Sequence, residues 1–379
     1  MSKGPLANNA TSLVNASPKI AIVIPVCDVA PYLEDCLDSV LKQTYSKFHV
    51  FAVDDKSSDS SPSILKSYLE ADSRVSVSFL DQRKGVSNAR NVALDQIDKL
   101  ANFDYVAFVD SDDILSPYFL EMLVKKSVEA ASDISVCGFF NFCDGKEAAE
   151  KLVAPTEKEL SQEEFIEHIF ARGRWNKKMG GGGMVWKALY SSNAVRGCRF
   201  PGDVKIVEDE VFSVKAAINS RKFAYVPLPL YGHRTRSGSL TCDKNIALER
   251  LRARMVAFEA GKQLSEEARL VMASAVADAS IKAFEYSGKF FETQLRSYKS
   301  LVLQAAAKGL IRKKKVGKFL LFCDYPTISK IFVTSRKFAA TLKNYVSEKK
   351  GALVSLFIVN RGDKEQVTKQ KPPPSIHHR

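Results

Sequence analysis

The sequence contains no long apolar run and no closely spaced pair of cysteines. Its longest apolar candidate, Leu353–Val359, is far shorter than the roughly 20 residues that cross a bilayer, and the opening residues, Met1–Ser17, are small and polar, unlike a signal peptide. The seven cysteines form no C-x-x-C pair, and the five histidines show no zinc-ligand spacing with them. These absences argue against a membrane span, a disulfide scaffold and structural zinc, and they predict reduced thiols in a cytosol.

Glycine is missing from the position where a dinucleotide-binding protein needs it. The segment that follows the first predicted strand, Pro25–Pro31, has no glycine, and the chain has no G-x-x-x-x-G-K-[ST] loop. The phosphates of a bound nucleotide would therefore need a counter-charge other than a glycine-rich cradle.

Basic residues are unevenly distributed along the 379 residues. The chain has a net charge of +13, but residues 296–379 carry 19 basic and four acidic residues, a net of +15, whereas residues 1–295 have a net of −2. Hydrophobic residues make up 45% of the chain, enough for a sizeable core. The sequence thus predicts a near-neutral globular part followed by a basic part suited to phosphate groups of lipid or nucleic acid.

The first 115 residues alternate between strand and helix patterns. Four short runs rich in β-branched residues read as buried strands, and helical spacing of apolar residues separates them. The predicted strands are Ile20–Val26, Phe48–Val53, Val75–Leu80 and Tyr105–Val109. This alternation predicts a parallel α/β sheet, in which ligands bind beyond the carboxyl ends of the strands.

Acidic residues follow two of these strands. Asp54 and Asp55 end the second, and Asp110, Asp112 and Asp113 end the fourth. Alternate acids on such a loop can offer hard oxygens to Mg²⁺ or Mn²⁺, which take their remaining ligands from phosphate and water. The alternative is that Asp112 or Asp113 caps the following helix.

Several segments, in order, resemble family 2 glycosyltransferases. The opening strand, the VDDKSSD loop at 53–59, GVSNARN at 85–91, FVDSDDILSP at 108–117, VEDE at 207–210 and LYGHRTRSGSLT at 230–241 are similar to that family's motifs. The resemblance is dense over 19–130 and thinner to 241. It implies a GT-A fold, a Rossmann-like α/β arrangement whose mainly parallel central sheet is flanked by helices, together with a nucleotide-sugar donor and Mn²⁺ or Mg²⁺.

The resemblance also implies roles for individual residues. Pro25, Asp54, Asp55 and Asp59 would shape the nucleotide site, with Asp55 accepting from the base. Asp110 would meet the ribose or the metal, and Asp112 would be the main metal ligand. The remaining implied positions are Arg90, which would help to position the donor, and Asp209, which would be the general base. Arg234 and Arg236 either clamp the diphosphate or are solvated charges.

Four residues at three sites depart from the family pattern. Cys27-Asp28 replaces the usual Tyr-Asn, Lys56 replaces a glycine, and Arg83 replaces an asparagine. The first two could alter contacts to the base, and Arg83 with Lys84 could add positive charge near the diphosphate. None of the three removes a required carboxylate.

The implied reaction follows from these groups. A sugar hydroxyl needs a carboxylate to accept its proton as it attacks the anomeric carbon, and Asp209 has acidic neighbours, Glu208 and Glu210, that could raise its proton affinity. One base and one displacement give inversion. The sequence therefore predicts an inverting transferase acting with a UDP-sugar on a glycan or lipid-linked glycan. A non-catalytic phosphate-binding adaptor is the alternative. A nucleotidyltransferase is disfavoured, because this sequence lacks the glycine- and lysine-rich activation loop expected near the first strand.

The expected organisation has a leader at 1–18, a GT-A domain at 19–241, a helical basic extension at 242–350 and a disordered tail at 351–379. The GT-A domain would divide into a nucleotide-binding half, 19–130, and an acceptor half, 131–241, where Gly180–Gly183 forms either a lid or a linker. Basic and aromatic residues alternate within 296–350, which favours docking on an anionic membrane surface over nucleic-acid binding. The expected location is the cytoplasm, at the inner face of the plasma membrane.

Overall fold

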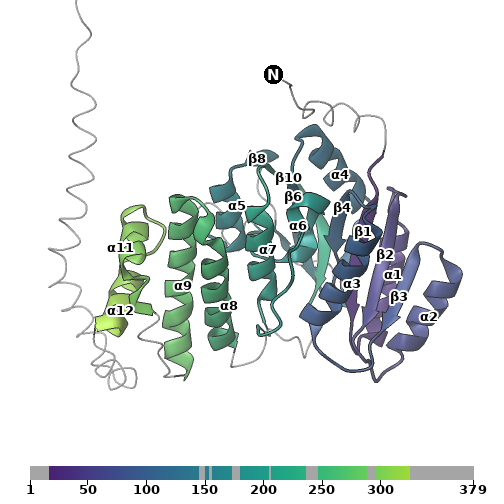
Figure 1. Cartoon of the computed structure of the whole chain (residues 1–379), viewed down its shortest axis with the longest axis horizontal. Helices are drawn as coiled ribbons and strands as arrows, with labels where there is room; N and C mark the ends of the chain where they lie inside the picture. Colours follow the sequence, from purple (N-terminus) through teal and green to yellow (C-terminus); the bar gives the residue numbers. More distant parts are fainter. Residues whose placement is uncertain are drawn as a thin grey trace, which may run out of the picture. The chain divides into compact units, whose positions relative to one another are not determined.

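A computed structural model describes residues 17–144, 150–152, 156–172, 180–204, 206–235, 246–287 and 295–324. The chain divides into two compact units, residues 1–276 and 277–379. The first unit holds a ten-stranded sheet whose main path is β3-β2-β1-β4-β9-β6-β10-β5 (Figure 1).

The first half of the sheet is parallel, as its sequence predicts. Its strands are β1 (Ile20–Val26), β2 (Phe48–Asp54), β3 (Val75–Phe79) and β4 (Tyr105–Phe108). All seven residues of β1 are buried, because β1 lies between β2 and β4 and helices cover both faces of the sheet. This burial accounts for the unbroken apolar run of β1 in place of an alternating pattern.

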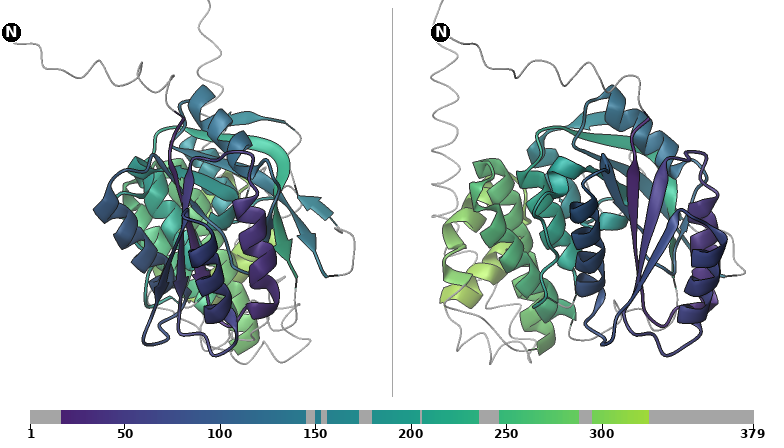
Figure 2. Two further views of the ribbon diagram at one scale, coloured as in Figure 1. Left: turned by 90° about the vertical axis from the view of Figure 1, so that its right-hand side faces the viewer. Right: turned by 45° about the vertical axis from the view of Figure 1, so that its right-hand side comes forward.

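Three helices connect these strands: α1 (Ala30–Leu41), α2 (Ser61–Ala71) and α3 (Val86–Leu100). Each of α1 and α2 has a proline in its first turn, where the missing N–H leaves no helical bond unmade. Helix α3 packs against β1 and β2, and α2 packs against β3. Right-handed crossovers place α3 on the opposite face from α1 and α2, as the right-hand view of Figure 2 shows.

The second half of the sheet is mixed. Its strands are β5 (Ile114–Leu115), β6 (Ile134–Phe142), β7 (Glu150–Leu152), β8 (Lys158–Leu160), β9 (Ala188–Ser191) and β10 (Phe223–Arg234). Strand β9 runs antiparallel to both β4 and β6, and β6 runs parallel to β10. The four residues of β9 are too few for a strand pattern to be recognised from the sequence. The α/β class with a central sheet flanked by helices is confirmed.

Helices accompany this second half and follow it. They are α4 (Phe119–Glu129), α5 (Gln162–Ile169), α6 (Ser192–Val195), α7 (Glu208–Ile218), α8 (Ile246–Ala260), α9 (Glu266–Ser287), α11 (Lys299–Ala307) and α12 (Lys313–Asp324). Among the described residues, no helix is long and apolar enough to span a membrane. Helix α8 belongs to the same compact unit as the sheet although it follows residue 241.

Candidate active site at the carboxyl edge of the sheet

The loops after β1, β2 and β3 are tied together by Asp55. The Asp55 N–H donates to the carbonyl of Val26 at 2.8 Å, and its carboxylate accepts from the N–H groups of Lys84 (2.8 Å) and Gly85 (2.7 Å). Its neighbour Asp54 is buried, and its Oδ1 has no hydrogen-bond partner among the described residues. An orphaned carboxylate oxygen at a strand end is suited to accept from a ligand.

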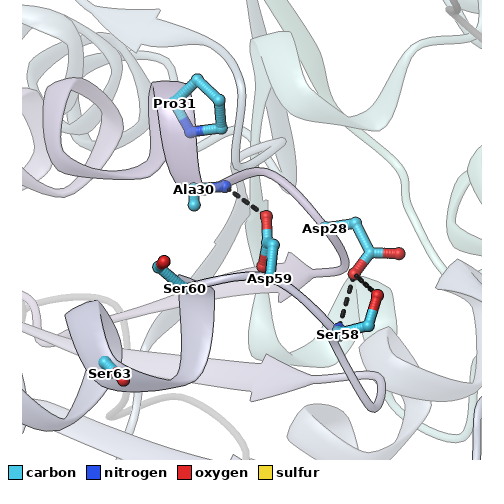
Figure 3. Close-up of a pocket in the computed structure, with 7 residues that line it drawn as sticks. All are labelled: Asp28, Ala30, Pro31, Ser58, Asp59, Ser60 and Ser63. Carbon is cyan, nitrogen blue, oxygen red and sulfur yellow. Dashed lines mark hydrogen bonds between the residues drawn. The ribbon is translucent and has the colours of Figure 1, made fainter.

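Asp59 connects the first residues of α1 and α2. Its two oxygens accept from the N–H groups of Ala30 and Ser61, each at 2.9 Å. An open pocket of about 850 Å³ lies beside it (Figure 3). The residues that line the pocket are Asp28, Ala30, Pro31, Ser58, Asp59, Ser60 and Ser63. The predicted residue Pro25 lies in β1, paired with Val53 and buried. The pocket therefore borders the nucleotide-side loops and does not contain the metal-binding candidates.

A buried arginine joins the two halves of the site. Arg90 donates from Nη2 to Asp110 Oδ1 and from Nη1 to Glu208 Oε1, both at 2.7 Å, and its guanidinium lies 5.0 Å from the centre of the Phe200 ring. Burial alone would lower the pKa of Arg90, but Asp110 and Glu208 raise it above its usual value. Arg90 thus stays charged between two carboxylates that are 98 residues apart in the chain.

Asp113 has a structural role that differs from helix capping. The Tyr231 hydroxyl donates to its Oδ2 at 2.8 Å and accepts from the Asp110 N–H at 3.1 Å, while the Arg234 N–H donates to Asp113 Oδ1 at 2.8 Å. Helix α4 begins only at Phe119, so neither Asp113 nor Asp112 is placed as its cap. Burial, and then the nearby Asp110 and Asp112, raise the pKa of Asp113 well above its usual value.

Arg234 is surrounded by acidic groups. Its Nε donates to the Asp112 carbonyl at 2.7 Å, and its two terminal nitrogens pair with Asp35 and Asp144. The guanidinium also lies 4.9 Å from the centre of the Tyr32 ring. Arg234 therefore fixes the loop after β4 to the end of β10, while Arg236 lies outside the described residues.

Asp110 and Asp112 are the two carboxylates on this loop that could hold a divalent cation. Asp110 gives one oxygen to Arg90 and keeps 30% of its side chain exposed, and Asp112 is partly exposed beside it. No cluster of three or more acidic, histidine or cysteine side chains that could hold a metal occurs among the described residues. Mg²⁺ and Mn²⁺ often take only one or two protein carboxylates and complete their shells with phosphate and water. The pair therefore suits a metal that arrives with a diphosphate.

Asp209 lies in the first turn of α7, between two acids that have partners. Val207, which precedes the helix, has φ of 69°, a left-handed conformation that is rare for a β-branched residue. Burial, and then the neighbouring Glu208, raise the pKa of Asp209 well above its usual value, although part of its side chain is exposed. A carboxyl group with raised proton affinity suits a general base.

Sequence reasoning missed the partner of Glu210. Arg254 on α8 binds both Glu210 oxygens, at 3.0 Å from Nε and 3.0 Å from Nη2. Gly183 packs so closely on Glu210 that an added Cβ would lie 2.6 Å from its Cγ. No local signal could have paired a glutamate with an arginine 44 residues away.

Lys187, which the sequence also did not indicate, binds the glycine-rich segment Gly180–Gly183. Lys187 is fully buried, and its Nζ donates to the carbonyl of Gly180, while the Gly182 N–H donates to the backbone carbonyl of His168 at 2.7 Å. Burial lowers the pKa of Lys187 to about 7. Gly180 and Gly182 are thus each held by a hydrogen bond, and Gly183 packs against Glu210.

The comparisons with known proteins agree with this geometry. The family model described as Glycosyl transferase family 2 matches residues 21–185. The chain is 32% identical over 230 residues to "Glycosyltransferase GlyA" of Streptococcus pneumoniae, covering 59% of this chain and 31% of GlyA. It is 31% identical over 210 residues to "Poly(ribitol-phosphate) beta-glucosyltransferase" of Bacillus spizizenii, covering 54% of this chain and 30% of that protein.

A solved structure shows the same fold. TarS 1–349 of S. aureus matches with a TM-score of 0.63 and 19% identity, over 85% of this chain and 92% of that chain. The chain spans about a third of the length of the two curated relatives named above, so those relatives contain much that has no counterpart in this match. The family match, the ordered motifs and the topology of the sheet together show that residues 21–185 match glycosyltransferase family 2 and that the chain has the GT-A fold.

Proposed function

We propose that this chain is an inverting glycosyltransferase that moves a sugar from a nucleoside-diphosphate donor to a hydroxyl of a glycan or lipid-linked glycan. The observation that carries the proposal is that the buried Arg90 forms ion pairs with both Asp110 and Glu208, which fixes the acidic loop after β4 to the start of α7. The guanidinium of Arg90 thereby holds both Asp110, on the donor side, and Glu208, the neighbour of the candidate base Asp209.

The donor side would use the loops after β1, β2 and β4. Asp54, with its orphaned oxygen, and Asp55 would contact the nucleoside, and Asp110 and Asp112 would hold a divalent cation shared with the diphosphate. Such a cation, when bound, neutralises the charge that develops on a leaving nucleoside diphosphate. UDP is the first nucleotide to test, because S. aureus TarS has been crystallised with UDP and with UDP-GlcNAc.

The acceptor side would use Asp209. Its carboxylate would accept the proton of the attacking hydroxyl, and Arg90 and Arg254 would keep Glu208 and Glu210 paired beside it. A single attack opposite the leaving group inverts the anomeric carbon. The B. spizizenii relative is named as a glucosyltransferase that acts on poly(ribitol phosphate). This name supports a surface polymer as the class of acceptor.

The basic part of the chain would bring the enzyme to such an acceptor at a membrane. Residues 296–379 carry a net charge of +15, and each basic residue near an anionic surface contributes about 1 kcal/mol to binding. We therefore propose that the protein acts in the cytoplasm at the inner face of the plasma membrane, in the synthesis of a surface polysaccharide.

The test is a donor screen with product analysis. UDP-, GDP-, CDP- and dTDP-sugars are each incubated with the chain and Mn²⁺ or Mg²⁺, and release of nucleoside diphosphate is measured with and without oligosaccharide acceptors. We expect release with one nucleotide class and, by NMR, a product of inverted anomeric configuration. Retention would refute the single-displacement mechanism. Absence of both release and nucleotide binding would favour the non-catalytic adaptor.

A further inference from the structure

Three of the four residues that depart from the family pattern lie together in the structure. Asp28 follows β1, Lys56 follows β2 and Arg83 follows β3. Arg83 Nη2 forms an ion pair with Asp28 Oδ2 and also donates to the carbonyl of Lys56 at 3.2 Å. Three residues from three loops are therefore joined through one guanidinium.

Asp28 is held from a second side as well. Its Oδ1 accepts from the Ser58 N–H at 2.7 Å and from the Ser58 hydroxyl at 3.1 Å, and its own N–H donates to the Ser57 hydroxyl at 3.0 Å (Figure 3 shows the Ser58 bonds). The Ser58 backbone and then Arg83 lower the pKa of Asp28 below its usual value. The carboxylate of Asp28 thus connects the loop after β1 to the loops after β2 and β3.

The backbone at two of these positions is unfavourable without such support. Asp28 has φ of 51° and Lys56 has φ of 59°, left-handed conformations that are uncommon for residues other than glycine, although aspartate adopts them more readily than lysine. The hydrogen bonds of Asp28 and the donation from Arg83 to the Lys56 carbonyl both act on this strained backbone. The interactions therefore stabilise one conformation of the loops.

The same loops carry the candidate nucleotide contacts. Lys56 adjoins Asp55, and Arg83 adjoins Lys84, whose N–H binds the Asp55 carboxylate at 2.8 Å. The loop after β3 is thus tied to the others twice, once through Asp55 and once through Arg83. A change in the hydrogen bond to Asp55 or in the contacts of Arg83 would therefore move Asp55.

We propose that Asp28 and Arg83 form a pair of positioning residues that fixes the nucleotide-side loops before a nucleoside diphosphate binds. This inference rests on the proposed function. It differs from the expectation that Arg83 supplies free positive charge to the diphosphate, because the charge of Arg83 is matched by Asp28. Loss of the pair weakens binding of the nucleoside itself, whereas loss of a phosphate contact weakens only phosphorylated ligands.

The experiment measures the affinities of UDP and uridine for four proteins by calorimetry: the wild type, Asp28→Asn, Arg83→Asn and the double variant. Asparagine is the residue that the family pattern has at both positions. Each single change leaves the other group without its charged partner. We expect UDP and uridine to bind about two- to fivefold more weakly to each single variant, in equal proportion, and the double variant to recover within twofold of wild type.

A matched control lies at the other end of β3. Arg74 forms an ion pair with Asp72 before that strand begins, so Arg74→Asn removes an arginine–aspartate pair far along the strand from the loops. We expect its affinities to equal those of the wild type. An effect of Arg83→Asn on UDP but not on uridine, or additive losses in the double variant, would overturn the proposal.

Hydrogen exchange without nucleotide separates this inference from the proposed function. In both single variants we expect faster exchange of amides in 56–60 and 81–86, and no change in Arg74→Asn. Unchanged exchange in both segments refutes the pair as a positioning device even if no nucleotide binds to the wild type. Wild-type protein that binds no nucleotide, but shows the expected exchange, overturns the proposed function alone.

Discussion

Adjacent acidic residues at the carboxyl edge of the sheet have different roles because their hydrogen-bond and ion-pair partners differ. Asp113 is buried against Tyr231 and the Arg234 backbone, whereas its neighbour Asp112 stays partly exposed. Glu208 and Glu210 bind arginines, whereas Asp209 between them is the candidate base. The sequence predicted that acids would gather at the strand ends, since parallel strands end at one edge. It could not assign their partners, because Tyr231 and Arg254 lie 118 and 44 residues away from the groups they bind.

Removing the candidate base should abolish transfer without unfolding the chain. Asp209→Asn keeps the shape of the side chain, and we expect kcat to fall about 10²- to 10⁴-fold, as is usual for loss of a general base. Because the pKa of Asp209 is raised in the folded state, the folded chain retains a proton that the unfolded chain releases. The contribution of Asp209 to stability is therefore lost as pH rises above the ordinary carboxyl pKa, and the variant lacks this contribution.

Kinetics and thermal unfolding at pH 7.5 check this prediction, with Glu129→Gln on the exposed face of α4 as the control. We expect the melting temperature of Asp209→Asn to equal or exceed that of the wild type. Full transfer by the variant would remove Asp209 from the mechanism.

Lys187 should give stability a distinct pH dependence. Burial lowers its pKa from 10.5 to about 7, so between these values the unfolded chain holds a proton that the folded chain lacks. Stability contributed by Lys187 therefore rises with pH across this window and is constant below it. We expect the free energy of unfolding of the wild type, relative to Lys187→Met, to increase by about 1 kcal/mol per unit from pH 7.5 to 9.5.

Urea denaturation of both proteins at several pH values measures this difference. A difference that is flat or falls with pH would mean that Lys187 is charged in the folded protein at all these values.

At the scale of elements, the parallel half of the sheet was predictable and the placement of α7 was not. Continuous apolar runs gave β1 and β2 within one residue of their ends, because strands buried on both faces have no other pattern. The start of α7 depends on the strained Val207 and on arginines from α3 and α8, and none of these is a local signal. The candidate base is therefore positioned by tertiary contacts.

Breaking the tie between α7 and α8 should reduce both stability and activity. Glu210 and Arg254 keep only 8% and 13% of their side chains exposed, so Arg254→Met leaves a buried carboxylate without its partner. We expect a loss of about 3–5 kcal/mol in the free energy of unfolding and a smaller loss in the Glu210→Met, Arg254→Met double variant.

Chemical denaturation and kcat measurements test this, with Arg252→Met as the control, since Arg252 lies on the same helix and is 56% exposed. A loss in the double variant as large as the sum of the single losses would show that the two side chains act independently.

At the scale of the whole molecule, charge is separated along the chain. The part that carries the sheet is close to neutral, and the basic excess follows Arg296. The described helices α8, α9, α11 and α12 lie within residues 242–350, where a helical extension is predicted. The predicted domain limits and the tail at 351–379 stay predictions, since residues after 324 lie outside the described part of the chain.

The basic part should bind anionic vesicles. Replacing Lys330, Arg336, Lys337 and Lys343 by glutamine removes four charges, and at about 1 kcal/mol each we expect binding to vesicles containing phosphatidylglycerol to weaken at least 100-fold. Co-sedimentation measures it. The control replaces four exposed lysines of the first unit, Lys66, Lys99, Lys125 and Lys262, and should leave binding nearly unchanged. Equal losses in both variants would indicate a response to total charge and not to this part of the chain.

We expect the carboxylates at the ends of β2 and β4 to form a metal-dependent nucleotide site. Calorimetric titration of UDP, with and without Mn²⁺, into the wild type and Asp112→Asn tests it most directly. We predict binding to the wild type that requires the cation and a loss of that requirement, together with at least tenfold weaker binding, in the variant. Equal, cation-independent affinity of the two proteins would show that Asp112 does not hold a cation needed for nucleotide binding.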